Sequence, residues 1–246
     1  MKIVAIGGGN LRLGDDAKPY NLDKINEEIV KLANKKCSRL LLYIGFNIHA
    51  DYYFSQIKTI FMEKGCQCSY LNFRELSNIK TVESKLKRAD IIFLPGGNTL
   101  EYMKKVRKFK IDKYLLEAAQ RGAVLAGISA GAIMCFEYGC SDAKKSSESI
   151  RRYTKVKGTG IQCGLIAPHY LSSDRVYDLP RMLKTCKKDM VAFGIDECAA
   201  LVIDGENYKI VRSGEEAKVF KCYFKGNEYF AEEITENGTL DKLYKI

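Results

Sequence analysis

Apolar runs alternate with amphipathic stretches along the first half of the chain. Segments with the character of sheet-forming strands occupy residues 2–7, 39–45, 66–73, 89–97 and 123–128. Apolar residues recur at helical spacing over residues 21–36, 51–65 and 111–122. Asn21 is a suitable cap for the first of these helices. Because strand and helix alternate and several strands are apolar on both faces, the pattern predicts a mostly parallel sheet with helices on both sides.

The pattern changes after about residue 190. Residues 199–214 and 217–234 are rich in β-branched and aromatic residues, and Asp-Gly, Ser-Gly and Lys-Gly pairs interrupt or end them. Such segments are typical of antiparallel hairpins. We therefore predict one α/β domain over residues 1–246, in which about 198–246 form a β-hairpin extension at the sheet edge.

The predicted strand at 123–128 leads directly into the sequence GISAGA, residues 127–132. Gly127, Ser129 and Gly131 satisfy the pattern G-x-S-x-G, in which a sharp turn between a strand and a helix exposes a nucleophilic serine. The same glycines would also serve a purely structural turn. A nucleophilic serine requires a base nearby, so the histidines decide between these interpretations.

The chain contains only two histidines, His49 and His169. His169 follows an apolar segment that ends at Pro168, and it is the better candidate for the base; His49 is interpreted as an exposed loop residue. An orienting carboxylate is expected beside the base. Asp196 and Glu197 end another apolar segment, and one of them is expected to face the site, because adjacent acids in an apolar stretch are costly without a role.

A third motif, LPGGNT at residues 94–99, follows the strand predicted near residue 90. The N–H of Gly97 and the N–H of Ala130 would provide the two donors of an oxyanion hole. Asn98 could contact substrate, or it could cap the following helix. The early GGGN sequence at 7–10 lacks the third glycine of a dinucleotide-binding loop, since Arg12 stands in its place, so we interpret it as a plain turn.

Composition narrows the class of protein. The 46% hydrophobic and 28% charged content argues against disorder. The nine cysteines form no CxxC pair, and with so few histidines a zinc site is not expected. No segment reaches the roughly 18 apolar residues of a membrane span, and the start of the chain does not resemble a signal peptide. We expect a cytoplasmic protein without a metal or organic cofactor.

The formal charge of +10 leaves a basic binding protein, including one that binds nucleic acid, as an alternative. The basic runs are interrupted by acidic and apolar residues and match no nucleic-acid motif. A binding protein would also not require serine, histidine and glutamate at the ends of apolar strands, where open α/β sheets place their sites. We therefore predict no nucleic-acid partner.

The ordered motifs LPGGNT, GISAGA, PHY and GIDE resemble those of the dipeptidase E and cyanophycinase family of serine peptidases. That resemblance implies a fold similar to class I glutamine amidotransferases. It also implies a Ser129–His169–Glu197 triad that hydrolyses small peptides through an acyl-enzyme. Asp142 matches a family aspartate that could replace Glu197 as the orienting acid or shape the pocket.

The resemblance implies the fold and the triad, but it does not fix which peptides are the substrates. Dipeptidase E cleaves peptides with N-terminal aspartate, whereas cyanophycinase cleaves β-aspartyl linkages. Arg181, with Arg175 as its competitor, could bind a substrate carboxylate, because arginine pairs with carboxylates in bidentate fashion. Ile128 and Ala167 depart from residues typical of the two branches, so neither specificity is transferred. The expected partner is a small peptide, and the expected assembly is a monomer or a homodimer.

Overall fold

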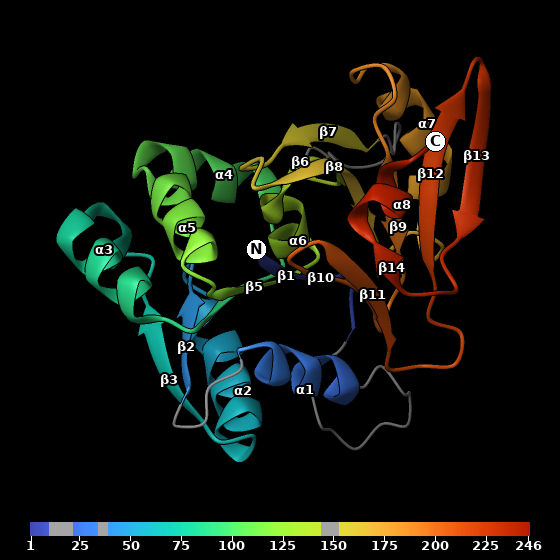
Figure 1. Ribbon diagram of the computed structural model, residues 1–246. Helices are drawn as coiled ribbons and strands as arrows, with labels where there is room; N and C mark the ends of the chain where they lie inside the picture. Colours follow the sequence, from blue (N-terminus) through green and yellow to red (C-terminus); the bar gives the residue numbers. More distant parts are fainter. Residues whose placement is uncertain (10–21, 34–38, 144–152) are drawn as a thin grey trace.

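The computed structural model describes residues 1–9, 22–33, 39–143 and 153–246, which form two β-sheets with helices packed around them (Figure 1). The predicted α/β class is confirmed. The division into two sheets does not follow from the sequence pattern, and it matters for the site because each sheet contributes different groups to it.

The first sheet has eight strands in the order β14-β11-β10-β1-β5-β4-β2-β3. Its parallel part consists of β1 (Lys2–Ile6), β2 (Arg39–Ile44), β3 (Cys66–Leu71), β4 (Ile91–Leu94) and β5 (Val124–Ile128). The antiparallel strands β10 (Ala199–Asp204), β11 (Asn207–Arg212) and β14 (Gly238–Thr239) extend it beyond β1. Since Ile6 of β1 pairs with Ile128 of β5, these two strands end level with each other.

Helices cover both faces of the parallel part. The helices α1 (Asp23–Leu32) and α2 (Ala50–Glu63) lie on one side, and α3 (Ile79–Arg88), α4 (Thr99–Lys108) and α5 (Ile111–Gln120) lie on the other (Figure 1). A short 3-10 helix, Glu75–Ser77, precedes α3. The three helices predicted from apolar spacing are thus confirmed. The proposed cap Asn21 lies outside the described residues.

The second sheet has six strands in the order β13-β12-β9-β8-β6-β7. Its strands are β6 (Phe136–Ser141), β7 (Thr154–Lys157), β8 (Gln162–Pro168), β9 (Ala192–Ile195), β12 (Val219–Lys225) and β13 (Glu228–Glu233). Only β6, β8 and β9 are mutually parallel. The predicted C-terminal hairpins are present, but β10 and β11 join the first sheet, whereas β12 pairs with β9 in the second.

The remaining helices lie near this second sheet in Figure 1: α6 (Ala130–Cys135), α7 (Arg175–Lys184) and α8 (Leu240–Tyr244). One hydrophobic cluster runs through both sheets and includes Val4 and Leu125 of the first and Ile166 and Phe193 of the second. Within the described residues, no helix is long and apolar enough to cross a membrane.

The two sheets meet where their parallel strands end. The N–H of His169, just after β8, donates to the carbonyl of Gly7, just after β1, at 3.2 Å. The N–H of Cys198 donates to the carbonyl of Gly8 at 3.0 Å, and Gly8 forms an isolated bridge with Glu197. Residues from β1, β5, β8 and β9 therefore come together at one edge, which is where the candidate residues are expected from the sequence.

Candidate active site

Ser129 stands on a strained turn between β5 and α6. Its backbone has φ 53° and ψ −111°, a conformation that residues other than glycine rarely adopt. Close packing explains the flanking glycines. A Cβ atom on Gly127 would lie 2.3 Å from the Gly131 carbonyl oxygen, and one on Gly131 would lie 2.0 Å from the Leu94 carbonyl oxygen. The turn therefore needs glycine on both sides and presents the Ser129 side chain at its apex.

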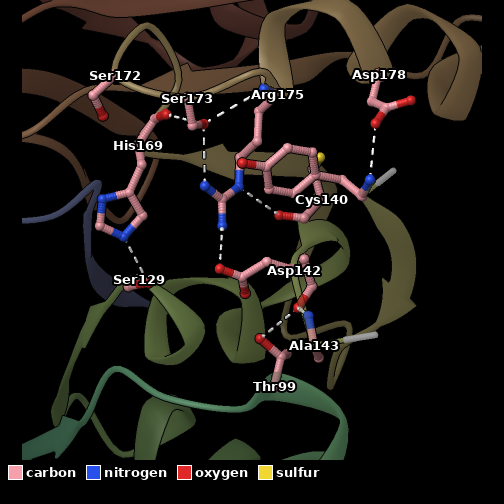
Figure 2. A network of polar contacts seen from close by, with 12 residues as sticks. Thr99, Ser129, Cys140, Asp142, Ala143, His169, Ser172, Ser173, Arg175 and Asp178 are labelled. Carbon is pink, nitrogen blue, oxygen red and sulfur yellow. Dashed lines mark hydrogen bonds and ion pairs between the residues drawn. The ribbon is translucent and has the colours of Figure 1, made fainter. Parts of the chain in front are cut away.

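His169 lies between Ser129 and Glu197. Its Nε2 atom is 2.8 Å from Ser129 Oγ, and its Nδ1 atom contacts Glu197 Oε1 (the Ser129 contact is drawn in Figure 2). Because a carboxylate can only accept, Nδ1 carries the proton of the neutral imidazole, which leaves Nε2 as an acceptor for the Ser129 hydroxyl. Ser129, His169 and Glu197 thus have the geometry in which a histidine can remove the serine proton.

Backbone strain accompanies the histidine and glutamate as well. His169 has φ 52° and Cys198, next to Glu197, has φ 58°. Asp196 fixes the same region: it is buried, and its Oδ1 accepts the N–H of Leu171 at 2.6 Å. Burial raises the pKa of the Asp196 carboxyl, an effect that the Leu171 hydrogen bond opposes. Of the two adjacent acids, Glu197 faces the histidine, and Asp196 holds the loop that carries it.

Gly8 is a site residue that the sequence analysis missed. A Cβ atom at this position would lie 2.2 Å from Glu197 Oε2 and 2.5 Å from His169 Nδ1. The absence of a side chain at Gly8 therefore makes room for the histidine and glutamate pair. The available signal is the glycine run after the first strand, and its interpretation as a plain turn is incomplete.

The loop after β4 brings Gly96 and Gly97 beside the serine. A Cβ atom on Gly96 would be 3.5 Å from Ser129 Cβ. Gly97 has φ 142°, and Tyr102 Oη occupies the space where its side chain would stand. The Tyr102 hydroxyl donates to the Gly96 carbonyl at 3.1 Å and accepts from Asn47 Nδ2 at 3.0 Å. These contacts hold the loop against the nucleophile turn.

The two N–H groups predicted to form the oxyanion hole belong to these two segments: that of Gly97 lies in the loop after β4, and that of Ala130 lies at the start of α6. Gly97 and Ser129 line the same cavity, and Ala130 is the first residue of α6. N–H groups in the first turn of a helix have no partner within the helix, so that of Ala130 can serve a ligand. Asn98 caps α4, because its Oδ1 accepts the Glu101 N–H at 3.1 Å. The capping role of Asn98 is thus shown, whereas a contact with substrate stays a prediction.

Asp142 pairs with Arg175 rather than with His169. Its Oδ2 is 3.6 Å from the Arg175 guanidinium (Figure 2). Arg175 is only 4% exposed. Its Nε donates to the Cys140 carbonyl at 3.1 Å, and its Nη1 donates to Ser173 Oγ at 3.1 Å. Ser173 in turn donates to the carbonyl of His169, so Arg175 supports the loop that carries the histidine.

Arg181 lies farther along α7, where its guanidinium donates to Asp178 Oδ1 at 3.0 Å and to the Tyr153 carbonyl at 3.3 Å. Neither Arg175 nor Arg181 lines the cavity beside Ser129. The structure therefore brings Gly97, Ser129 and His169 to one cavity and leaves both arginines outside it. A substrate-carboxylate role for either arginine stays a prediction.

The cavity beside Ser129 has a volume of about 650 Å³. Aromatic rings form much of its wall, supplied by Tyr43, Tyr52, Tyr53, Phe93 and Tyr102. Asn47 and Gln56 add amide groups, and His49 lies at the exposed rim. The expectation that His49 is exposed is confirmed, but His49 also contributes to the wall of the cavity. Cavities of this size hold small organic ligands.

Comparison with known proteins gives the family. The profile of peptidase family S51 matches residues 3–211. YgaJ, an uncharacterised peptidase of Bacillus subtilis strain 168, is 27% identical over 228 residues, which cover 92% of this chain and 94% of that protein.

Two solved structures share the fold. A peptidase from an acI-B1 Actinobacterium superposes with a TM-score of 0.71 at 18% identity, covering 96% of this chain and 95% of the other. A protein assigned as a peptidase E from Listeria monocytogenes EGD-e gives a TM-score of 0.61 at 14% identity, over 86% of this chain and 98% of the other. Because the profile match covers most of the chain, it confirms the resemblance to the dipeptidase E family: the protein is a serine peptidase and belongs to peptidase family S51.

Proposed function

We propose that this peptidase hydrolyses small peptides through an acyl-enzyme formed on Ser129. The observation that carries the proposal is the 2.8 Å contact between Ser129 Oγ and His169 Nε2 at the wall of an open cavity, with Glu197 on the opposite ring nitrogen. A serine is a weak nucleophile unless a neighbouring base removes its proton. His169 is placed to act as that base.

In the acylation step, Ser129 Oγ attacks the carbonyl carbon of the scissile peptide bond while its proton passes to His169 Nε2. The imidazolium that forms is stabilised by Glu197, which stays ionised. Negative charge develops on the carbonyl oxygen, and the N–H groups of Gly97 and Ala130 are proposed to stabilise it. His169 then gives its proton to the leaving amine, and the C–N bond breaks.

Water completes the cycle. His169, again neutral, takes a proton from a water molecule that attacks the acyl carbon, and a second tetrahedral intermediate forms. The proton returns through His169 to Ser129 Oγ, and the ester bond breaks to release a carboxylate product. The protein atoms end in their starting state, so the net reaction is hydrolysis of one peptide bond.

The size of the cavity supports a small peptide as the substrate. The preference for aspartyl peptides, and the alternative of β-aspartyl linkages, would each require a group that binds the aspartyl carboxylate. The described residues of the cavity wall include no lysine or arginine for that purpose. A cytoplasmic location and a monomeric or homodimeric state remain predictions.

The proposal is tested by incubating the enzyme with a panel of dipeptides and measuring the release of free amino acids by mass spectrometry. The wild type is expected to hydrolyse at least one dipeptide. Adding hydroxylamine during turnover is expected to divert the acyl group to an aminoacyl hydroxamate, because hydroxylamine competes with water for an acyl-enzyme.

Ser129→Ala is the matched control, since it removes only the attacking oxygen. It is expected to lose hydrolysis and hydroxamate formation together. Hydrolysis that persists in this variant, or hydrolysis without any hydroxamate, would contradict an acyl-enzyme on Ser129.

A further inference from the structure

The backbone of His169 is held in a strained conformation by hydrogen bonds from two directions. Its φ of 52° lies in the left-handed region, which residues other than glycine keep only where the surrounding structure enforces it. On one side, the N–H of His169 donates to the Gly7 carbonyl at 3.2 Å. On the other side, the His169 carbonyl accepts the Ser173 hydroxyl at 2.5 Å. The Ser173 bond therefore helps to fix the turn from which the imidazole reaches Ser129.

The Ser173 hydroxyl is directed at that carbonyl by Arg175. Nη1 of Arg175 donates to Ser173 Oγ at 3.1 Å, and the backbone N–H of Arg175 donates to the same oxygen at 3.4 Å (Figure 2). Guanidinium and backbone N–H groups only donate, so they occupy the lone pairs of the hydroxyl and leave its single proton for His169. The bond to His169 thus depends on Arg175 as well as on Ser173.

Arg175 is itself fixed by groups of the second sheet and its neighbours. It is the first residue of α7 and is 4% exposed. Its Nε donates to the Cys140 carbonyl of β6 at 3.1 Å, and its guanidinium carbon lies 4.4 Å from the centre of the Tyr153 ring. Asp142, whose side chain is 53% exposed, lies 3.6 Å from the guanidinium. Because the guanidinium is buried and bound on several sides, it can orient the Ser173 hydroxyl but offers little surface to a substrate carboxylate.

We propose that Arg175 and Ser173 are positioning residues for His169. Arg175 orients the Ser173 hydroxyl, and Ser173 holds the turn of His169 so that its Nε2 stays within reach of Ser129 Oγ. The inference rests on the proposed function, because it assumes that His169 is the base. It gives Arg175 a role in the activation of Ser129, in place of the contact with a substrate carboxylate that the sequence suggests.

The rate of labelling by a fluorophosphonate tests this inference. The reagent reports the activation of Ser129, and it carries no carboxylate for an arginine to bind. Intact mass is followed over time for each variant. The end point gives the fraction of molecules with an intact site, and the rate constant reports how well His169 activates the serine in those molecules.

Ser173→Ala removes the hydroxyl. All molecules are expected to be labelled in the end, but about tenfold more slowly than the wild type or slower still, because displacing a catalytic group by about 1 Å can cost about 10²-fold in rate. On the best dipeptide, kcat should fall by a similar factor with little change in KM. Ser173→Thr keeps a hydroxyl and should restore most of the rate.

Ser77→Ala is the matched control for Ser173→Ala. It removes a serine hydroxyl that also donates to a backbone carbonyl, that of Arg74 at 3.4 Å, in the short 3-10 helix before α3. This variant should be labelled at the wild-type rate.

Arg175→Lys tests the first link between Arg175 and the histidine. Lysine keeps the charge, but its single nitrogen cannot reproduce the forked geometry in which Arg175 donates to Cys140 and Ser173. Labelling is expected to slow by about three- to tenfold, the range given by the loss of one hydrogen bond. In the double variant, Arg175→Lys should add little to the effect of Ser173→Ala, because Arg175 acts through the Ser173 hydroxyl.

The inference is overturned if Ser173→Ala is labelled at the wild-type rate. It is also overturned if only a smaller fraction of Ser173→Ala molecules is labelled while these react at the wild-type rate, since that pattern indicates a role in folding alone. An Arg175→Lys variant with a raised KM and unchanged labelling would instead identify a substrate-binding arginine. Failure of the proposed function gives a different result, because the folded wild type would then not be labelled, and the inference would fall with it.

Discussion

The two sheets contribute different kinds of groups to the site. The first sheet supplies Ser129, the proposed nucleophile, and the proposed oxyanion donors, through tight glycine turns after β5 and β4. The second supplies side chains, His169 after β8 and Glu197 after β9. The turn after β5 holds the half-buried Ser129 at the cavity without help from the second sheet, and we propose that only the junction between the sheets makes it a nucleophile. Removing His169 or Glu197 should therefore abolish activation of the serine while leaving its position at the cavity intact.

The largest effect is expected from Glu197→Gln. Its amide can donate to His169 Nδ1, which favours the tautomer with a proton on Nε2, and that nitrogen can then no longer accept the proton of Ser129. We expect kcat to fall by about 10³- to 10⁴-fold with little change in KM, because Glu197 does not line the cavity. Steady-state kinetics on the best dipeptide measures both constants.

Asp142→Asn is the matched control for that variant. Asp142 is half-exposed and pairs with Arg175, so its loss should change kcat by only a few-fold. A large loss in Asp142→Asn with a small one in Glu197→Gln would reassign the orienting acid from Glu197, after β9, to Asp142, after β6 of the same sheet.

A smaller effect is expected from Gly8→Ala, which acts at the junction itself. The added methyl group would overlap Glu197 Oε2 and His169 Nδ1, so the pair must move. Displacing a catalytic group by about 1 Å can cost about 10²-fold in rate, and we expect a loss of that order in kcat. Gly214→Ala adds the same methyl where the nearest atom is 3.7 Å away, and it should retain full activity. Equal activity of the two variants would show that the junction does not position the histidine.

The smallest effect is expected from Asp196→Asn, and it concerns stability rather than rate. Burial raises the pKa of Asp196 in the folded protein, so the folded state holds its proton at pH values where the unfolded state has lost it. As pH rises from about 4 through that raised pKa, the wild type loses stability from this group, and the asparagine variant does not. The unfolding free energy of the variant minus that of the wild type should therefore increase with pH.

Chemical denaturation at a series of pH values between about 4 and 7 measures this difference. The asparagine side chain of the variant still offers an oxygen to the Leu171 N–H, so the loop is expected to keep its position. A difference that falls as pH rises would mean that ionised Asp196 stabilises the loop, against the direction expected here.

The part of the site that the first sheet contributes could be predicted from short sequence motifs. The GISAGA turn and the strand before it are defined by neighbouring residues, and Ser129 stands where that pattern predicts. The shortage of histidine selects His169, and the resemblance implies Glu197 beside it, but the sequence leaves Asp142 open as the orienting acid. The contact of His169 with Glu197 is decided by the structure. Packing between distant segments is not predictable in the same way. Gly8 matters only because Glu197 and His169 lie against it. Tyr43 stands in the buried strand β2, and nothing in the sequence marks it as a residue that lines the cavity.

The strand order of the second sheet could not be predicted from the sequence, for a related reason. The segments after residue 198 are correctly assigned as hairpins, but nothing in their own sequence says which edge they join. β10 pairs with β1, and β12 pairs with β9, so the choice depends on edges formed elsewhere in the chain. Burial of Arg175 likewise depends on Cys140, Ser173 and Asp142, and the sequence alone does not separate it from a surface arginine.

The central claim is that groups of the second sheet turn Ser129 into a nucleophile, and labelling with a fluorophosphonate tests it most directly. This reagent reacts with activated serines, and intact-mass analysis counts its adducts. We predict one adduct on the wild type, none on Ser129→Ala, and labelling of His169→Ala slowed by about 10²-fold or more. A folded wild type that stays unlabelled, or an adduct that persists on Ser129→Ala, would contradict the account.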